Sequence, residues 1–473
     1  MKYSRLCSIL IISFLIVLLA GCAQIARVGK MISGSAPASR AQEAKSQPAA
    51  SQEAAKPAET KPDETKKPQA AAPEARPPVG PGEIKPAPSK PVEMILPETD
   101  KPLPPGAAVN RNAVGCILPL TGRFADAGNK ALDAILLSAE TFNQRYSSPW
   151  RMVIADSGEA KDGMQKAFAY LAEKAHVMAI IAVAGSSEAT DAALEAEKRN
   201  VPLILITSRE GVTAGRDYVF QHFLTPTQQM QALARYAIDK MNVAIFSILY
   251  PQDDYGEEMT RLFRREIQKV GGKVNKAIPY SKAQTDFSEQ IGKLTGQKLE
   301  TSDKSYGSQQ DAKARMFVDF EALFIPDSHQ RLKMITSQLA FYDVKGFKLL
   351  GTSLWQSPDL LKKGSEYLEG AVFADSFLAN GFLPETNDFV DVYYSTYSRE
   401  PENIDALAYD TMEMVLGILE DEKVKTRDDF IQALLAVDRF QGATGSVYFR
   451  GNHVAQKSAF MIKIQNGKLG QVK

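Results

Sequence analysis

The folded part of this chain is constrained most strongly by short apolar runs that alternate with amphipathic stretches from residue 113 onward. The apolar runs are almost continuous, which is typical of strands that are covered on both faces. Alternating strands and helices favour a parallel sheet with helices on both of its sides. In the first half of this region we expect strands at 113–118, 152–155, 178–184 and 202–207, separated by helices at 127–143, 163–174 and 188–199.

The same pattern begins again after residues 219–226 and indicates a second sheet of the same kind. The region from Arg111 onward holds roughly 360 residues, more than one compact core usually contains, so two lobes of the α/β class are expected. A polar stretch at 296–315 is interpreted as a surface insertion. The expected elements are helices at 227–240, 257–270, 287–294 and 330–341, strands at 243–250, 273–280, 322–325 and 348–350, tail helices at 387–398, 405–419 and 427–436, and tail strands at 445–449 and 459–464.

The first residues have the pattern of an export signal. Lys2 and Arg5 precede an apolar run at 9–20, which is shorter than a membrane-spanning helix and has no charged stop-transfer cluster after it. The run ends in Leu-Ala-Gly-Cys at 19–22, which resembles the bacterial lipobox and implies a signal peptide at 1–21 and lipidation of Cys22. The alternative is an ordinary cleaved signal that ends near a cysteine. The residue after Cys22 is Ala23 and not an aspartate. In this respect the chain resembles the lipoproteins that are sorted to the outer membrane.

Residues 22–109 are expected to form a disordered linker. The stretch at 23–109 lacks Phe, Trp and Tyr and is rich in proline, so it cannot build a core. With Cys7 in the signal and Cys22 acylated, Cys116 is the one cysteine of the folded region, and no disulfide is expected within the chain. The 56 basic and 56 acidic residues balance, which argues against a nucleic-acid surface.

Polar residues follow two neighbouring strands of the expected first sheet. In doubly wound sheets, ligands bind outside the carboxyl ends of the strands, where loops run into helices. Ser186 and Ser187 stand between a strand and a helix, and Thr207, Ser208 and Arg209 stand after the next strand. Hydroxyls, helix N–H groups and a guanidinium favour an anionic ligand group. The alternative is that these serines only cap helices.

Several phrases stand in the order found in a known family. Residues 114–122 with Gly128, then 184–187, 206–208, 254–256, 406–410 and 444–447, resemble the type I periplasmic binding proteins that take branched-chain amino acids. The resemblance implies two doubly wound parallel-sheet lobes joined by three crossings, within a domain at 110–473. The implied lobe I covers about 110–228 and 376–445, and lobe II covers about 229–375 and 446–473.

The same resemblance implies roles for individual residues. Ser186 or Ser187, with Thr207 or Ser208, would hold the carboxylate of an amino-acid-like ligand, and Asp327 its ammonium group. Tyr255 and Trp355 would close over the ligand from the second lobe, and Phe124 would stack on it. Three alternatives stay open: Asp327 could cap a helix, Trp355 could be packing, and Arg209 could either select an acidic ligand or block the cleft.

A narrower resemblance concerns the second lobe. The phrases at 319–327, 351–355 and 368–373 are similar to those of the penicillin-binding-protein activators, outer-membrane lipoproteins of this fold that act on a peptidoglycan synthase. Their best-studied members carry a helical-repeat domain ahead of this fold. Here the proline-rich linker stands in its place.

Nothing in the sequence indicates an enzyme. Nucleophile-elbow, phosphate-loop, His-Glu-x-x-His and Cys-x-x-Cys motifs are missing, and the four histidines share no ligand spacing, so no cofactor or metal is expected. We therefore expect a non-enzymatic lipoprotein anchored in the cell envelope, facing the periplasm, with the outer membrane as its expected address. The first hypothesis is an activator-like regulator of peptidoglycan synthesis that touches a synthase. The alternative is a solute-binding receptor that feeds an ABC transporter.

Overall fold

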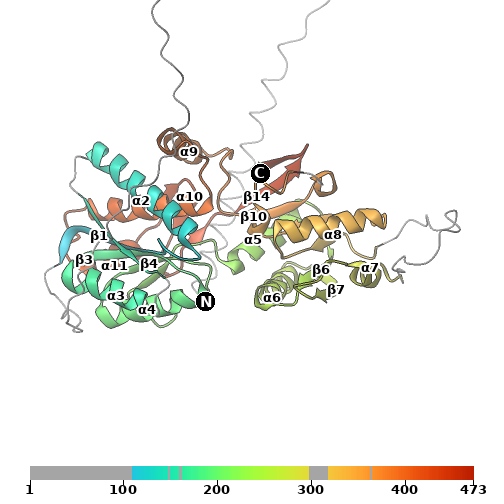
Figure 1. Cartoon of the computed structure of the whole chain (residues 1–473), viewed down its shortest axis with the longest axis horizontal. Coiled ribbons are helices and arrows are strands. Elements are labelled where there is room, and N and C mark those ends of the chain that lie inside the picture. The colour runs from blue at the N-terminus through green and yellow to red at the C-terminus, as the bar shows by residue number, and fades with distance from the viewer. Residues whose placement is uncertain (1–108, 147–149, 159–161, 298–317, 363–364, 473) are drawn as a thin grey trace, which may run out of the picture. The chain divides into compact units, whose positions relative to one another are not determined.

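The computed structural model describes residues 109–146, 150–158, 162–297, 318–362 and 365–472 (Figure 1). The expected signal peptide, Cys22, all but the last residue of the expected linker, and nearly all of the expected insertion at 296–315 lie outside these residues. Within the described ranges, none of the helices combines the length and the hydropathy that a membrane span requires.

The first lobe is built on a fully parallel sheet, as its continuous apolar runs predicted. Its strand order is β2-β1-β3-β4-β5. All the side chains of β4 and most of those of β1 and β3 are buried, so these strands are covered on both faces. The strands are β1 (Asn110–Leu118), β2 (Arg151–Asp156), β3 (Val177–Val183), β4 (Leu203–Ile206) and β5 (Val219–Gln221).

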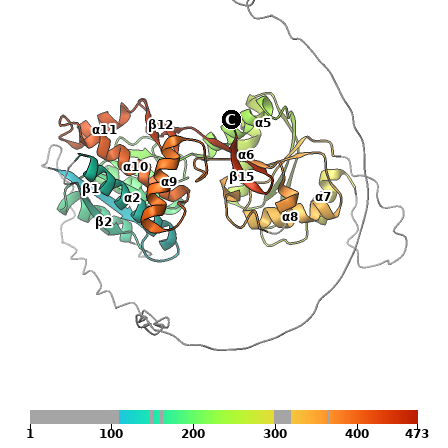
Figure 2. The same ribbon diagram turned by 90° about the horizontal axis from the view of Figure 1, so that it is seen from above.

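Helices cover both faces of this sheet, and each face has its own core. On one face α3 (Gly163–Ala169), the π-helical turn η2 (Tyr170–Lys174) and α4 (Ser186–Arg199) pack against β1, β3 and β4. The other face carries four helices, among which α2 and α10 lie side by side (Figures 1 and 2). These are α2 (Ala125–Tyr146), α9 (Pro384–Tyr397), α10 (Asn403–Leu419) and α11 (Arg427–Leu435).

The second lobe has a mixed sheet with the order β15-β14-β10-β9-β8-β6-β7. The five strands from β10 to β7 are parallel, which confirms the predicted class, while the β14–β15 hairpin runs antiparallel at one edge. The strands are β6 (Ile245–Pro251), β7 (Lys273–Tyr280), β8 (Ala322–Phe324), β9 (Lys348–Gly351), β10 (Val372–Asp375), β14 (Phe460–Gln465) and β15 (Lys468–Val472).

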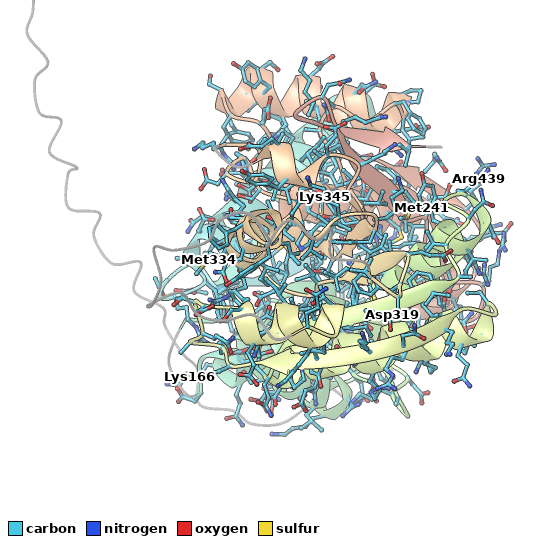
Figure 3. The ribbon with its side chains drawn as sticks, turned by 90° about the vertical axis from the view of Figure 1, so that its right-hand side faces the viewer. Lys166, Met241, Asp319, Met334, Lys345 and Arg439 are labelled. Atoms are coloured by element: carbon cyan, nitrogen blue, oxygen red, sulfur yellow. The ribbon has the colours of Figure 1, made fainter. Side chains whose placement is uncertain are left out.

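Two pairs of helices cover this second sheet. The pair α5 (Pro226–Asp239) and α6 (Asp254–Lys269) packs on one face, and α7 (Ser288–Thr295) with α8 (His329–Phe341) packs on the other. Asp319, labelled in Figure 3, lies just before β8 and forms an ion pair of 3.1 Å with Lys276 of β7. This pair links the described residues on the two sides of the gap at 298–317.

Three segments of the chain join the two sheets: 222–225 after β5, 376–383 after β10, and 458–459 before β14. We call them the first, second and third crossings. A small antiparallel sheet of β11 (Phe440–Gly442), β12 (Gly445–Tyr448) and β13 (Gln456–Lys457) precedes the third crossing. It lies beside β5 because Gln221 is bridged to Val454. The chain therefore enters the second sheet later than the boundary expected at 445/446.

Candidate ligand-binding site

The carboxyl ends of β1, β3 and β4 meet at one edge of the first sheet because these neighbouring strands are parallel. The loops that follow them carry the residues singled out in the sequence. Phe124 is 43% exposed, and the guanidinium of Arg123 lies 4.3 Å from its ring centre. A methyl group added at Gly185 would lie 3.8 Å from the Phe124 ring, so the loops after β1 and β3 lie close together.

Ser186 and Ser187 are exposed and form the first turn of α4. The residue that caps this helix is Gly185, and no side chain caps it. Neither serine hydroxyl has a hydrogen-bond partner within the described residues, so the alternative that they only cap a helix is not what the structure shows. The turn presents free hydroxyls and backbone N–H groups, which is the chemistry that binds a carboxylate.

Glu188 also stands at this helix terminus, and the sequence analysis did not consider it. A methyl group added at Gly185 would lie only 2.7 Å from the Glu188 Oε2 atom, so this carboxylate folds back over the start of α4. An anion close to a helix N-terminus is stabilised by the helix dipole. A ligand carboxylate that binds to Ser186 and Ser187 would compete with Glu188 for the same positive field.

The backbone of the loop after β4 is held in place by Gln221, and the side chains of Ser208 and Arg209 are exposed. The Gln221 Nε2 atom donates to the carbonyls of Thr207 at 2.7 Å and Arg209 at 3.0 Å. Thr207 is buried, and its Oγ1 atom accepts from the backbone N–H of Arg209. Ser208 and Arg209 are exposed, no helix begins here, and the Arg209 guanidinium forms no ion pair within the described residues. Ser208 is therefore not a helix cap.

On the second lobe, Tyr255 and Asp327 follow the carboxyl ends of β6 and β8. The Tyr255 hydroxyl donates to Thr352 Oγ1 at 2.9 Å, and burial raises the pKa of this tyrosine. Asp327 accepts a 2.6 Å hydrogen bond from the Tyr280 hydroxyl and another from the Ser328 N–H. Ser328, not Asp327, caps α8. Both carboxylate oxygens of Asp327 are thus already hydrogen-bonded, although each retains capacity to accept another donor.

Trp355 is placed in the core of the second lobe and not at its surface. Its side chain is fully buried and packs against Phe373, with ring centres 6.1 Å apart. A Cβ at Gly351 would overlap the Trp355 ring at 2.1 Å, so this glycine makes room for the indole. This burial shows that Trp355 packs in the core, which was the alternative left open by the sequence.

Asp375 is a buried acidic residue at the same edge of the second sheet that the sequence analysis missed. It ends β10, and burial raises its pKa to about 7. One of its oxygens, Oδ1, accepts from the Ser376 N–H at 2.7 Å and from the Asn403 side chain. Its negative charge also contributes to the raised pKa of Tyr255. The only signal in the sequence was an aspartate that ends an apolar strand.

Two further findings bound the chemistry. Within the described residues, no group of three or more His, Cys, Asp or Glu side chains is arranged to hold a metal ion. A hollow of about 880 Å³ lies along the outer face of α6. Its lining mixes both charges, with Glu257, Arg261 and Arg264 among its side chains, and none of the candidate residues above belongs to it.

Comparisons with known proteins agree with this geometry. Residues 113–468 match the family described as periplasmic binding protein. No curated protein sequence matches the chain. A leucine binding protein from Thermotoga maritima has 22% identity and a TM-score of 0.57, and the match covers 76% of this chain and 97% of that one.

Two other solved structures are similar over the same region. A branched-chain amino acid transporter substrate binding protein from Streptococcus pneumoniae, in complex with isoleucine, has 21% identity and a TM-score of 0.58, with 77% and 99% of the two chains covered. A solute binding protein of an ABC transporter from Rhodopseudomonas palustris, in complex with 3,4-dihydroxybenzoic acid, has 18% identity and a TM-score of 0.59, with 76% and 96% covered. The family match spans most of the chain, and the parallel sheets with their helical layers are those of the type I fold. This chain belongs to the periplasmic binding protein family.

Proposed function

We propose that this chain is a solute-binding protein that takes a small carboxylate-bearing ligand at the strand ends of its two lobes. The observation that carries the proposal is the first turn of α4, where two exposed serines without hydrogen-bond partners begin a helix. The exposed Arg209 follows the adjacent strand and has no ion-pair partner within the described residues. A helix N-terminus and a forked guanidinium together suit a carboxylate.

The rest of the ligand would lie between Phe124 and the second lobe. Phe124 offers an exposed ring for an apolar or aromatic part. Asp327 could accept an ammonium group through its remaining lone pairs. The similar structures were solved with isoleucine and with an aromatic acid, and these two ligands share a carboxylate but not an ammonium group. We therefore commit to the carboxylate as the recognised group and leave the amino group as a property to be measured.

The proposed partner is a membrane transporter, because the similar proteins are transporter substrate-binding proteins. This favours the solute-binding alternative over the first hypothesis, an activator-like regulator of peptidoglycan synthesis. We propose a periplasm-facing protein without catalytic activity, anchored by lipid on Cys22, with the outer membrane as its address. Cys22→Ala should move the protein from the membrane fraction to the soluble fraction, whereas continued detergent-sensitive membrane association would contradict the anchor.

The experiment for the ligand is thermal unfolding of the purified protein with a panel of probes: L-leucine, L-isoleucine, L-glutamate, benzoate and 3,4-dihydroxybenzoate. A probe at a hundred times its dissociation constant adds about 2.7 kcal/mol of stability. We expect Ser187→Ala and Arg209→Gln to reduce the shift, because they remove a hydroxyl and the guanidinium from the carboxylate subsite. Glu188→Gln should increase it, because the competing carboxylate is gone.

The matched control is Arg439→Gln, which removes an exposed arginine of the first lobe that has no partner within the described residues and lies outside the site. It should leave the shift unchanged. Absence of a shift with every probe would contradict the solute-binding proposal. A shift that survives Ser187→Ala and Arg209→Gln would show a binding site elsewhere in the molecule.

A further inference from the structure

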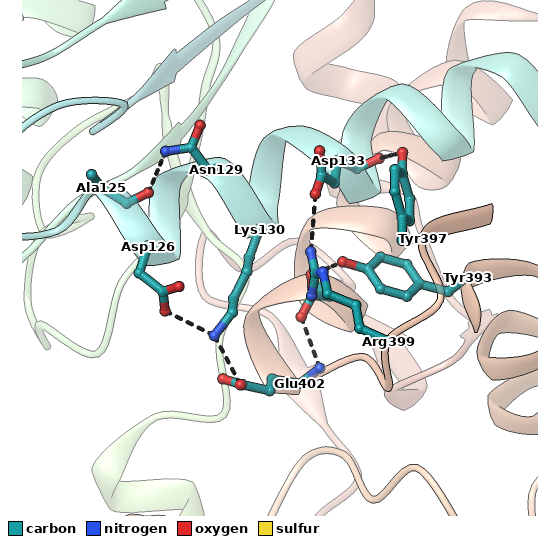
Figure 4. A network of polar contacts seen from close by, with 10 residues as sticks. Ala125, Asp126, Asn129, Lys130, Asp133, Tyr393, Tyr397, Arg399 and Glu402 are labelled. Atoms are coloured by element: carbon teal, nitrogen blue, oxygen red, sulfur yellow. Dashed lines mark hydrogen bonds and ion pairs between the residues drawn. The ribbon is translucent and has the colours of Figure 1, made fainter. Parts of the chain in front are cut away.

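Helix α10 is fixed to the body of the first lobe by a polar network at its N-terminal end (Figure 4). Lys130 of α2 forms ion pairs of 2.8 Å with both Asp126 and Glu402. Arg399 pairs with Asp133 of α2 at 3.0 Å and with Asp405 of α10 at 3.3 Å. These contacts, with the shared hydrophobic core, join α10 to α2. Whatever binds to α10 is therefore held to the first lobe.

The first crossing and the residue that precedes the third crossing meet beside the middle of α10. His222 begins the first crossing, and its Nδ1 atom lies 2.8 Å from Thr411 Oγ1. Lys457 stands immediately before the third crossing, and its Nζ atom lies 2.9 Å from His222 Nε2 and 2.6 Å from Thr444 Oγ1. Thr444 in turn donates to Asp410 at 2.5 Å. Thr411 of α10 thus contacts the first crossing and Asp410 contacts Thr444, and Lys457 bridges His222 and Thr444.

The directions of these hydrogen bonds follow from chemistry. An ammonium can only donate, so His222 must accept at Nε2 and is neutral with its proton on Nδ1. Burial, and then the charge of Lys457, hold the pKa of His222 well below its ordinary value. Burial lowers the pKa of Lys457 to about 8, against the opposing effect of Asp410. His222, Lys457 and Asp410 are the charged or titratable groups that face one another here.

The N-terminal end of α10 contacts the second crossing. Asn403, the first residue of the helix, donates to Asp375 and accepts a 3.1 Å hydrogen bond from the Ser376 hydroxyl. The first and second crossings therefore contact α10 directly, and Lys457, just before the third crossing, reaches it through His222 and Thr444. The charged side chain of Lys457 joins the first crossing to the start of the third. Its removal would leave His222 Nε2 and Thr444 Oγ1 without this hydrogen-bond donor.

We propose that Lys457 is a positioning residue of the hinge: by contacting both His222 and Thr444 it ties the start of the third crossing to the start of the first, beside α10, and so limits how far the lobes move apart. The inference rests on the proposed solute-binding function, because a hinge matters only if the lobes open and close. The test of this role needs no ligand.

The test is hydrogen–deuterium exchange of the full-length protein, with and without Lys457→Met, read by mass spectrometry of its peptides. The reporting amides are those of Gln221, which donates to the His453 carbonyl at 2.8 Å, and Ala455, which donates to the Gln221 carbonyl at 2.9 Å. We expect both to exchange about tenfold faster in the variant, the effect of losing one buried hydrogen-bonded contact. Peptides from the core strands β3 and β8 should be unchanged. The matched control is Lys463→Met, a half-buried lysine of β14.

A second readout separates the hinge role from general packing. In the wild type, acid protonates His222, and the imidazolium then repels the ammonium of Lys457. The amides of Gln221 and Ala455 should therefore exchange faster, relative to core amides at the same pH. His222→Gln keeps an acceptor for Lys457 but does not titrate, and should abolish this dependence. Equal acceleration in the cores, no acceleration beyond that of Lys463→Met, or an unchanged pH profile in His222→Gln would each overturn the proposal. Thermal-shift results bear only on the proposed function.

Discussion

Asp375 shows how one side chain at a crossing can make the stability of this fold depend on pH. Asp375 is 3% exposed, and its carboxylate forms no ion pair within the described residues. Burial raises its pKa from the ordinary value to about 7, and the hydrogen bonds from Ser376 and Asn403 offset only part of this effect. Because the folded pKa lies above the unfolded one, the folded state holds the proton more tightly. Its contribution is most favourable at acid pH and is lost as the pH rises through about 7.

Asp375→Asn should therefore be more stable than the wild type at pH 8, by about 1–3 kcal/mol, because it removes a buried charge and can keep the carbonyl that accepts from Asn403. The difference should disappear towards pH 4, where the wild-type carboxyl is protonated. Urea unfolding across this pH range measures it. Asp391→Asn, at an exposed position of α9, is the control and should show no such trend. A less stable Asp375→Asn at pH 8 would mean that the charged form is needed.

The side chains of the candidate site differ in how far the sequence could point to them, for a physical reason. Ser186, Ser187 and Arg209 were singled out because a strand end followed by polar residues is a local signal, and their role in binding stays a prediction. Trp355 was expected at the cleft, but an indole suits a core and a cleft equally, and only the missing Cβ of Gly351 reveals its slot. Asp375 and Asn403 meet across a crossing, and no local pattern reports a contact between segments so far apart.

At the scale of elements, the buried strands and long helices could be read from the sequence, because continuous apolar runs and a helical period are local properties. The short strand β5 was recognised only as a segment between the two halves. Strand β12 was assigned to the second lobe, whereas it pairs with β11 and β13. Pairing depends on which segments meet in space, so neither the edge hairpin nor this small sheet followed from periodicity alone.

Helix α10 is the element that links these scales. Its apolar residues made it predictable as a core helix, and eleven of its side chains, among them Asp405 and Asp410, are buried. Asp410 accepts from the backbone N–H groups of Ala443 and Thr444, both at 2.8 Å, and so anchors the turn between β11 and β12. Buried carboxylates are costly unless they are hydrogen-bonded. The hydrogen bonds that Asp410 accepts from Ala443 and Thr444 offset this cost here.

For the whole molecule, the proposed function requires that one ligand stabilise both lobes, and the chain offers a natural way to observe this. It has two tryptophans. Trp150 is packed in the core of the first lobe and Trp355 in that of the second. Trp355→Phe leaves a fluorescence signal from the first lobe alone, and Trp150→Phe leaves one from the second. Both substitutions keep an aromatic ring, so the loss of packing is smaller than for alanine.

We expect any probe that stabilises the wild type to raise the free energy of unfolding of both single-tryptophan variants by the same amount. The reason is that a ligand held at the strand ends of both lobes stabilises each lobe against unfolding. Fluorescence-detected urea unfolding, at a fixed ratio of probe to its dissociation constant, makes the measurement. Arg209→Gln in either background should reduce both shifts together. A shift in the Trp355→Phe background alone would place the ligand on the first lobe only, and the second lobe would then have no part in recognition.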